Sequence, residues 1–433
     1  MHITLLTIGS RGDVQPFVAL AAGLQAAGFR TRLATHARFE ALAAEYGLEF
    51  APIHTDPQAM LHSDAGRAWL DSDRNPIGLI WNMIRLGKPI FEQLIQDAEA
   101  ACVGTDLIIY SLFGNAAYSI GQKMGIPTIL ANLQPMFGPT AAFPAPGSPT
   151  WPSAIPLLGS WYNKFSYRLV EQVFWQPFRP LVNQWRKEHL GLPKIPFWGP
   201  YKQLYEDRAP SLYAYSPAVI PRPAEWPEWY HVTGYWFLDE PTDWAPPADL
   251  QAFLEAGPPP VYIGFGSMTD KNPAELTNMI VTALTKAGQR GILHSGWAGL
   301  NTAALPDTIF VVDEIPHAWL FPHMAAVVHH GGAGTTAAGL RAGVPNLVVP
   351  YFADQHFWGE QVTDLGVGPA ALPRRSLTAA QLGLAIQTAV SNQPMRDKAA
   401  ALGAQIRQED GVARAIELIK QWWPSQAAVP DQR

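Results

Sequence analysis

The sequence contains a single cysteine, Cys102, and no long uninterrupted apolar segment. One thiol excludes an intramolecular disulfide and a thiolate cage for a metal, and it favours a reducing compartment. No apolar run approaches the ~18 residues of a membrane-spanning helix, and the N-terminal segment lacks the basic start and apolar length of a signal peptide. From the sequence we therefore expect a soluble, cytoplasmic protein.

Charge is also scarce, at 15% of the 433 residues, and 30 Lys or Arg stand against 36 Asp or Glu, which gives a net charge of −6. A negative net charge argues against nucleic acid as the partner, and it suits a small or apolar ligand. The chain is longer than the ~100–200 residues of a typical domain, and 48% of it is hydrophobic. We therefore expect two domains with large cores.

Short apolar segments alternate with helical patterns in both halves of the chain, which is typical of a parallel sheet with crossover helices. In the first half we expect strands at 2–8 and 30–35, a loop at 9–15 and a helix that begins at Pro16. In the second half, Asn272 and Gly288 bound a predicted helix, and further strands are predicted at 261–265, 291–294, 309–312, 326–329 and 346–349. The predicted fold class is α/β, with two facing, doubly wound domains.

Proline and tryptophan concentrate between residues 135 and 260, which hold 23 of the 40 prolines and nine of the 16 tryptophans. Because regular crossovers do not tolerate so many prolines, we expect loops and short helices over the first domain. The predicted division is a domain at 1–240 with an insertion at about 135–240, a linker at 241–260, a domain at 261–411 and a final helix in 412–433.

A glycine-rich segment at 329–336, His-His-Gly-Gly-Ala-Gly-Thr-Thr, lies between a predicted strand and a predicted helix. Unpaired amides at such a helix start attract anions, and His330 and Thr335 add donors for a diphosphate. A tight turn with helix-capping threonines is the alternative. Gly266 and Ser267 follow the strand 261–265 and should reach the same sheet edge, where Ser267 offers a hydroxyl.

Other nucleotide and metal signatures are missing or weak. The sequence has no G-x-x-x-x-G-K-[ST], which excludes a P-loop NTPase, and no G-x-G-x-x-G, which disfavours a nicotinamide enzyme. Asp71-Ser72-Asp73 looks like a D-x-D metal signature, but two carboxylates in a loop are common by chance, and a solvated turn is the preferred interpretation. His317, His323, His329 and His330 lack the helical spacing of a metal pair. We expect neither a metal nor another cofactor.

Asp13 lies in the first strand-to-helix loop, where open sheets bind ligands. It is a candidate base for a substrate hydroxyl, provided that burial raises its pKa, and a simple helix cap is the equal alternative. Aromatic residues of the middle segment suggest a large apolar acceptor pocket, although core or lid packing explains each one singly. They are Trp151, Trp161, Phe165, Trp175, Trp185 and Trp198.

Five segments, in order, resemble the sterol 3β-glucosyltransferases and their bacterial relatives: 9–16, 264–267, 315–321, 329–336 and 354–359. The opening Gly-Ser-Arg-Gly-Asp-Val-Gln-Pro is also similar to the antibiotic glycosyltransferases. The resemblance implies a GT-B fold and inverting, metal-independent transfer from a UDP-sugar. It also implies that the final helix crosses back to the first domain.

The resemblance further implies a role for individual residues. Asp13 matches the general base, and Ser10 lies at the acceptor. The groups that hold the diphosphate are Gly266, Ser267, His330 and the amides of Gly332, Gly334 and Thr335. The backbone of His317 contacts the uracil. Asp354 and Gln355 bind the sugar hydroxyls. A glutamine at 355 favours glucose over galactose. Glu314 departs from the stacking tryptophan of the plant enzymes.

The predicted function is glucosyl transfer from UDP-glucose to a sterol or similar hydrophobic alcohol, with peripheral contact at the inner membrane face and no nucleic acid partner. A nucleotide-sugar epimerase, a non-catalytic lipid-binding protein and an NAD-dependent oxidoreductase are the alternatives. The true acceptor and the oligomeric state are not predicted.

Overall fold

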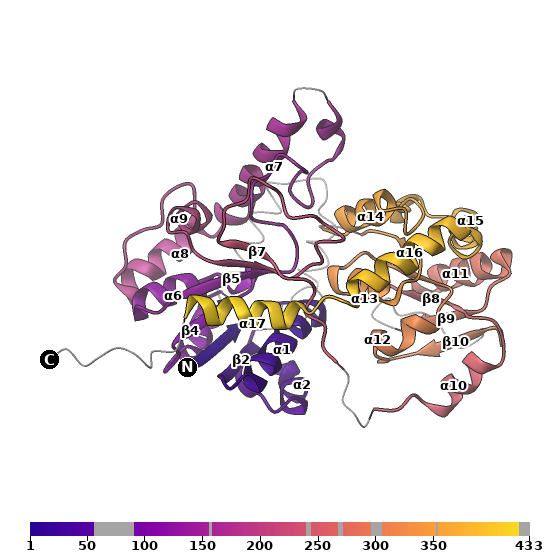
Figure 1. Cartoon of the computed structure of the whole chain (residues 1–433), viewed down its shortest axis with the longest axis horizontal. Coiled ribbons are helices and arrows are strands. Elements are labelled where there is room, and N and C mark those ends of the chain that lie inside the picture. The colour runs from indigo at the N-terminus through magenta and orange to yellow at the C-terminus, as the bar shows by residue number, and fades with distance from the viewer. Residues whose placement is uncertain are drawn as a thin grey trace. The chain divides into compact units, whose positions relative to one another are not determined.

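A computed structural model describes residues 1–55, 91–155, 158–239, 244–266, 272–295, 305–351 and 354–423. The chain forms two compact units (Figure 1). Unit 1 comprises Met1–Tyr215, Arg222–Leu238 and Asp410–Arg433, and unit 2 comprises Ser216–Pro221 and Asp239–Glu409. Among the described residues, no helix combines the length and the apolar character needed to cross a membrane.

Unit 1 is built on a parallel sheet with the strand order β3-β2-β1-β4-β5-β6-β7. The strands are β1 (His2–Leu6), β2 (Arg30–His36), β3 (Glu49–Ile53), β4 (Leu107–Tyr110), β5 (Thr128–Asn132), β6 (Ser211–Tyr213) and β7 (Tyr230–Val232). Its helices are α1 (Arg11–Ala26), α2 (Glu40–Glu45), α6 (Ala116–Met124), α7 (Gly159–Trp175), α8 (Arg179–Trp185), α9 (Pro200–Glu206) and α17 (Gly411–Trp422). Because both faces of a parallel sheet are covered at its centre, the central strand β4 is apolar and buried at every position.

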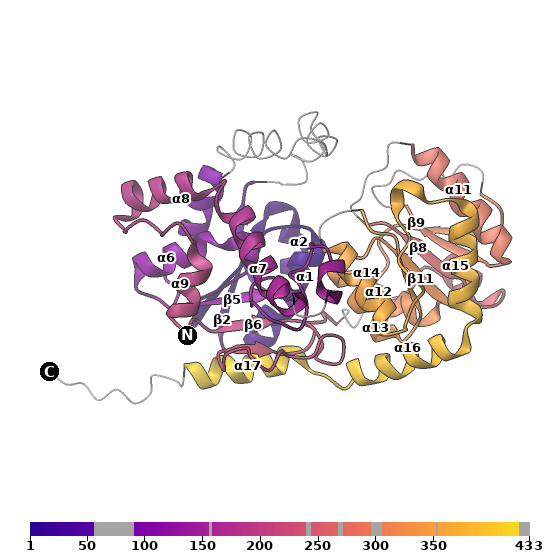
Figure 2. The same ribbon diagram turned by 90° about the horizontal axis from the view of Figure 1, so that it is seen from above.

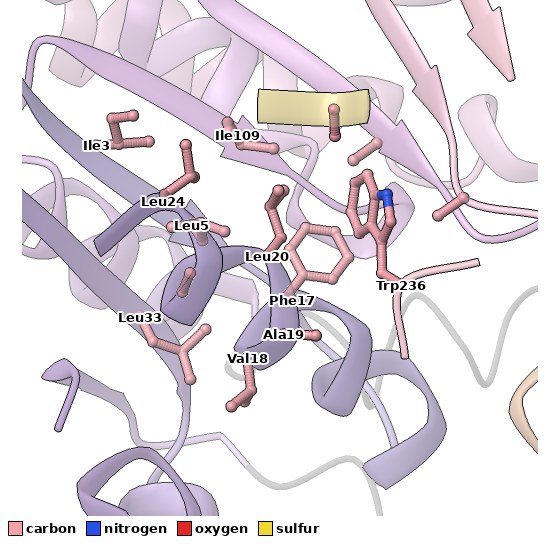
Figure 3. Packing of buried hydrophobic residues seen from close by; sticks show 14 of the residues in the cluster. Ile3, Leu5, Phe17, Val18, Ala19, Leu20, Leu24, Leu33, Ile109 and Trp236 are labelled. Carbon is pink, nitrogen blue, oxygen red and sulfur yellow. The ribbon is translucent and has the colours of Figure 1, made fainter. Parts of the chain in front are cut away.

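Helix α1 packs its buried face on this sheet (Figure 3). Phe17 meets the edge of Trp236 at a ring-centroid distance of 5.8 Å. The helix α17 lies beside α1, where the absence of a side chain at Gly23 makes room for it: a Cβ atom there would lie 2.5 Å from Val412 Cγ1. The last helix of the chain thus completes the core of unit 1.

Unit 2 holds a second parallel sheet, with the order β10-β9-β8-β11-β12. Figure 2 labels its strands β9, β8 and β11. Its strands are β8 (Val261–Gly264), β9 (Gly291–His294), β10 (Ile309–Val312), β11 (Ala326–His329) and β12 (Asn346–Val348). Its helices are α10 (Ala248–Glu255), α11 (Pro273–Ala287), α12 (His317–Leu320), α13 (Ala333–Ala342), α14 (Gln355–Asp364), α15 (Ala379–Ser391) and α16 (Gln393–Ile406). The order places β8 and β11 side by side at the centre, where strand order reverses and open sheets bind ligands.

The predicted α/β fold class is confirmed, and in unit 2 the predicted helix at 273–287 and the strands at 291–294, 309–312 and 326–329 agree with the structure. Unit 1 differs at its first helix. The sequence pattern predicts a helix from Pro16, but α1 begins at Arg11 because Ser10 and Asp13 form a capping box around the preceding turn. Pro16 lies inside the helix and lacks only the N–H that would bond to Gly12.

The expectation of loops and short helices between 135 and 240 was wrong in two places. The structure contains a helix of 17 residues, α7, and two short strands, β6 and β7, which extend the sheet of unit 1. No proline lies between residues 157 and 176 or between 228 and 240, so the backbone there can form regular hydrogen bonds. The predicted linker at 241–260 also contains a helix, α10, whose Leu250 is fully buried.

Candidate functional site

In unit 1, Asp13 lies in the first turn of α1 and closes the loop after β1. Its Oδ2 atom accepts hydrogen bonds from the Ser10 N–H at 2.7 Å and from the Ser10 hydroxyl at 2.9 Å. Among the described residues, nothing donates to Oδ1. One carboxylate oxygen therefore caps the helix, while the other remains for a ligand, so capping and a chemical role are compatible.

The surroundings of Asp13 favour its neutral form. Burial raises the pKa of the carboxyl above its ordinary value, although the hydrogen bonds from Ser10 and the charge of Arg38 act in the opposite direction. Arg38 donates through Nη2 to the carbonyl oxygen of Gly9 at 2.9 Å. A raised pKa makes the ionised carboxylate a stronger base.

Gly9 and His36 fix the conformation of the loop that leads to Asp13. Gly9 has φ +145°, and a Cβ atom there would lie 2.3 Å from Asp13 Oδ2. Its N–H donates to His36 Nε2 at 3.1 Å, and His36 Nδ1 meets the carbonyl oxygen of Thr55. His36 is therefore the Nδ1–H tautomer, buried at the end of β2. His36 was not among the site residues predicted from the sequence, because its only signal is a polar residue at the end of a strand beside β1.

The loop geometry gives a direct test at two neighbouring glycines. We expect Gly9→Ala to lower the free energy of unfolding by about 1–3 kcal/mol, because the added methyl group meets the carboxylate and the φ angle is strained. Gly12→Ala is the matched control: its Cβ would meet only Ser10 Oγ, at 3.7 Å, so it should be neutral or slightly stabilising. Urea unfolding of both variants measures the difference, and equal stabilities would contradict this account.

In unit 2, two loops leave neighbouring strands at the same sheet edge, because His329 of β11 pairs with Gly264 of β8. The ring of His330 lies between two glycines. A Cβ atom at Gly266 would lie 2.9 Å from His330 Cε1, and one at Gly332 would lie 2.4 Å from Nε2. The structure thus brings Gly266, His330 and Gly332 together as predicted, whereas Ser267 lies outside the described residues.

His330 is neutral, because burial lowers its pKa to about 4. Its Nδ1 atom is buried and has no hydrogen-bond partner in the part of the chain that the structure describes. A buried polar atom without a partner costs ~1–3 kcal/mol, and binding of a ligand at that atom would remove the cost.

The preceding histidine holds the glycine loop in place. His329 is fully buried, and burial lowers its pKa to about 3. It accepts from the Gly331 N–H at 3.1 Å and donates to Asn346 Oδ1 at 3.1 Å, while Asn346 Nδ2 donates to the Val344 carbonyl oxygen at 2.9 Å. Neither this role of His329 nor Asn346 was predicted from the sequence.

The start of α13 faces the same loop. Its N-cap residue, Gly332, has no side chain to cap the first amides, and Thr336 turns its hydroxyl back to the Gly332 carbonyl oxygen at 2.9 Å. Gly334 is exposed and Thr335 is half-buried. The first-turn amides are thus suited to an anion.

Asp354 and Gln355 lie against this loop at the start of α14. A Cβ atom at Gly331 would lie 2.9 Å from the carbonyl oxygen of Gln355. Asp354 Oδ2 accepts from Trp358 Nε1–H at 3.1 Å, and the buried Gln355 accepts through Oε1 from the Tyr351 N–H at 2.8 Å. Both side chains therefore also stabilise the turn at the start of α14.

The remaining predicted residues are more scattered. His317 begins α12, stacks on Phe321 at a centroid distance of 4.3 Å and lies with Nε2 3.4 Å from the Tyr262 hydroxyl. Trp175 is buried, whereas Trp161 is 63% exposed, and the side chain of Trp151 lies outside the described part. Of the two among these tryptophans whose side chains the structure describes, one therefore lies in the core and the other on the surface, which does not support a shared pocket.

The described residues also lack a cluster of metal ligands. Among the residues that the structure describes, no three His, Cys, Asp or Glu side chains could together hold a metal ion. Asp71-Ser72-Asp73 lies outside those residues.

Comparison with known proteins covers both units. Residues 3–140 match the glycosyltransferase family 28 N-terminal domain, and residues 288–414 match the erythromycin biosynthesis protein CIII-like C-terminal domain. The chain is 39% identical to a sterol 3-beta-glucosyltransferase of Aspergillus fumigatus over 97% of its own length. It spans only 30% of the length of that relative.

Among solved structures, the calicheamicin glycosyltransferase CalG4 is similar with a TM-score of 0.70 and 17% identity, over 99% of both chains. The Streptomyces sp. SF2575 glycosyltransferase SsfS6, complexed with thymidine diphosphate, gives a TM-score of 0.63 and 19% identity over 97% of this chain and 99% of that one. These likenesses confirm the predicted two-domain GT-B fold.

Proposed function

We propose that the chain transfers glucose from UDP-glucose to a hydrophobic alcohol. Residues 3–140 match a glycosyltransferase family model, the fold is that of GT-B glycosyltransferases, and 97% of the chain is related to part of a fungal sterol 3-beta-glucosyltransferase. A sterol 3β-hydroxyl is the preferred acceptor in this proposal. The transfer is a single displacement that inverts the anomeric carbon and needs no metal.

The observation that carries this proposal is that the two carboxylate oxygens of Asp13 have different surroundings. Oδ2 is anchored by two hydrogen bonds from Ser10, and Oδ1 has no donor among the described residues. In the proposed reaction, Oδ1 takes the proton of the acceptor hydroxyl as its oxygen attacks the anomeric carbon. The bond from that carbon to the diphosphate breaks, and UDP leaves from the opposite face. General base catalysis of this kind contributes ~10²–10⁴ in rate.

The proposed donor site is the loop of unit 2. The developing charge on the diphosphate would meet the first amides of α13 and the imidazole of His330, whose unpartnered Nδ1 supports this assignment. His317 would contact the uracil through its backbone, and Asp354 with Gln355 would contact the sugar hydroxyls. Since helix amides can stabilise the leaving group, no metal is required in this mechanism.

His330→Ala tests the donor site. The variant loses one hydrogen-bonding group while the loop amides remain, so we expect UDP to bind more weakly by ~1–3 kcal/mol. Calorimetric titration with UDP measures this directly. His323→Ala is the control, because His323 is exposed in the same unit. If UDP binds to His330→Ala as it does to the unaltered chain, His330 serves only the fold.

The proposed reaction is tested by mass spectrometry of products from UDP-glucose and a panel of sterols, terpenoid alcohols and macrolides, with EDTA present and absent. We expect a glucoside of a hydrophobic alcohol under both conditions, and faster turnover with UDP-glucose than with UDP-galactose. An isomerised sugar formed without acceptor would identify an epimerase. Acceptor binding without any product would identify a lipid-binding protein.

A further inference from the structure

Helix α7 has its apolar side outward. Four of its large apolar side chains, spaced four residues apart, form an exposed stripe: Trp161 at 63%, Phe165 at 46%, Leu169 at 53% and Val173 at 56% exposure. We call these four residues the apolar stripe. It runs along most of the helix, or ~18 Å at 1.5 Å per residue. Figure 1 shows α7 rising away from the sheet of unit 1.

The opposite side of α7 is buried and largely polar. Asn163 donates through Nδ2 to the Ala141 carbonyl oxygen at 2.8 Å, Ser166 accepts from the Ala145 N–H at 2.8 Å, and Glu171 is only 2% exposed. A surface helix of a globular protein normally shows the reverse distribution. The hydrogen bonds fix this orientation, so the helix cannot turn its stripe inward without leaving buried polar groups unpaired.

A second apolar group continues the stripe at the C-terminal end of α7. Phe197 is 51% exposed and Trp198 is 55% exposed. Their backbone carbonyl oxygens accept hydrogen bonds from helix side chains, at 3.2 Å between Gln172 Nε2 and Trp198 and at 2.9 Å between Gln176 Nε2 and Phe197. Gln172 and Gln176 lie on the same side of the helix as the apolar stripe.

The charge around this surface is positive. Lys164 and Arg168 are exposed on α7, and the helix's only acid, Glu171, is buried and paired with Arg168 at 3.0 Å. Residues 151–206 carry seven Lys or Arg against three Glu and no Asp, in a chain with a net charge of −6.

Trp198 also borders a cavity of about 610 Å³. Lys194, Lys202 and Arg186 line it together with Glu206 and Asp207. Arg186 is 2% exposed and donates only to neutral acceptors, namely Ser119 Oγ at 2.7 Å, Gln122 Oε1 at 2.8 Å and the Pro193 carbonyl oxygen at 3.0 Å. No ion pair to a carboxylate among the described residues compensates its charge.

We propose that the apolar stripe, with Phe197 and Trp198, docks on the surface of an anionic lipid bilayer. The apolar side chains would enter the boundary between headgroups and acyl chains, while Lys164, Arg168 and Lys202 meet the lipid phosphates. A second copy of the chain fits less well, because a two-fold contact would bring these basic residues against each other. Docking itself does not depend on the reaction; where the proposed function holds, it gives access to an acceptor dissolved in the membrane.

The test is sedimentation of the full chain with vesicles of phosphatidylcholine, with and without phosphatidylglycerol, in the absence of donor and acceptor. We expect binding that is stronger with phosphatidylglycerol and weakened by salt. The double variant Leu169→Glu/Val173→Glu should lose at least ~10-fold in bound fraction. Leu384→Glu is the matched control, since Leu384 is 66% exposed on α15 of unit 2, and it should bind like the unaltered chain.

A second variant, Lys164→Gln/Lys202→Gln, keeps the apolar stripe and should lose only the preference for phosphatidylglycerol. Thermal unfolding of each variant verifies that it folds. The proposal is overturned if the unaltered chain does not sediment with either vesicle, or if Leu169→Glu/Val173→Glu binds as well as Leu384→Glu does. It is also overturned, in favour of a second copy, if the unaltered chain is a dimer that does not bind vesicles and Leu169→Glu/Val173→Glu is a monomer. Because no substrate is present, a failure to bind vesicles does not contradict the proposed reaction. Likewise, a failure of the proposed reaction does not contradict binding to the bilayer.

Discussion

Replacing Asp13 by Asn is expected to lower kcat at least ~10²-fold, because the amide cannot take the proton of an acceptor hydroxyl. The substitution preserves the shape of the side chain, and an amide oxygen can still accept from Ser10 at the start of α1. UDP affinity should be unchanged, since the residues proposed to bind UDP belong to unit 2. Steady-state kinetics and calorimetry measure the two effects separately.

Asp410→Asn is the control for the capping role of such an aspartate. Asp410 caps α17 by accepting from the Ala413 N–H at 2.8 Å, so Asn should be tolerated there in stability and in activity alike. Near-normal turnover of Asp13→Asn on its best acceptor would refute the base assignment, even if glucosyl transfer itself stands.

The raised pKa of Asp13 gives the same residue a pH signature. The acid limb of kcat/KM should lie above the ~3.9 of an ordinary aspartate, because protonation of Asp13 removes the base, and Asp13→Asn should lose that limb. For stability, a pKa raised by folding favours the protonated group. The stabilising contribution of Asp13 is therefore complete at a pH below its pKa in the unfolded chain. It is lost as the pH rises through its pKa in the folded chain. At pH 7, Asp13→Asn should therefore be at least as stable as the unaltered chain.

Gly331→Ala should disable the proposed donor site and lower the free energy of unfolding by about 3 kcal/mol, through both strain and overlap. Gly331 has φ +90°, and its Cβ would lie 2.6 Å from Val348 Cγ1 and 2.9 Å from the Gln355 carbonyl oxygen. Because a backbone oxygen cannot move aside as a flexible side chain can, the glycine loop and the start of α14 must separate. UDP titration and urea unfolding measure the two losses.

Gly288→Ala is the control that separates steric overlap of the added methyl group from backbone strain at a positive φ. Gly288 also has a positive φ, +63°, at the end of α11, but a Cβ atom there would meet nothing within 4 Å. We expect it to cost only the ~1–2 kcal/mol of a left-handed residue and to leave UDP binding unchanged. If the two variants were equally stable, the crowding around Gly331 would not matter energetically.

Local signals were sufficient for much of unit 2. Asn272 before α11 and Gly288 after it mark both ends of that helix. The glycine loop was predicted at the correct sheet edge for the same reason, since strand, glycines and helix follow one another directly in the sequence. By contrast, Pro16 misled the prediction of α1, because a favourable N1 residue outweighed the less conspicuous capping pair of Ser10 and Asp13 before it.

Long-range side-chain bonds were beyond a reading of the sequence. The bond from Gly9 to His36 joins residues 27 apart, and that between His329 and Asn346 joins residues 17 apart. Both depend on which strands are neighbours and in what register. The aromatic residues failed for another reason: tryptophan is equally suited to a core, where Trp175 lies, and to a surface, where Trp161 lies. Their number predicted an apolar function but not its location.

The position of α17 on α1 has a consequence for biosynthesis. Its buried Ala415, Leu418 and Ile419 join the same core as Phe17 and Leu20, which leave the ribosome almost a whole chain earlier. At ~5–20 residues per second, the matching face of α1 stays uncovered on the order of tens of seconds. All of Asp239–Glu409 emerges before α17 does, so unit 2 can fold while unit 1 still lacks its last helix. The nascent chain therefore exposes this apolar face of α1 throughout the interval, and a chaperone that holds the face would prevent aggregation until synthesis ends.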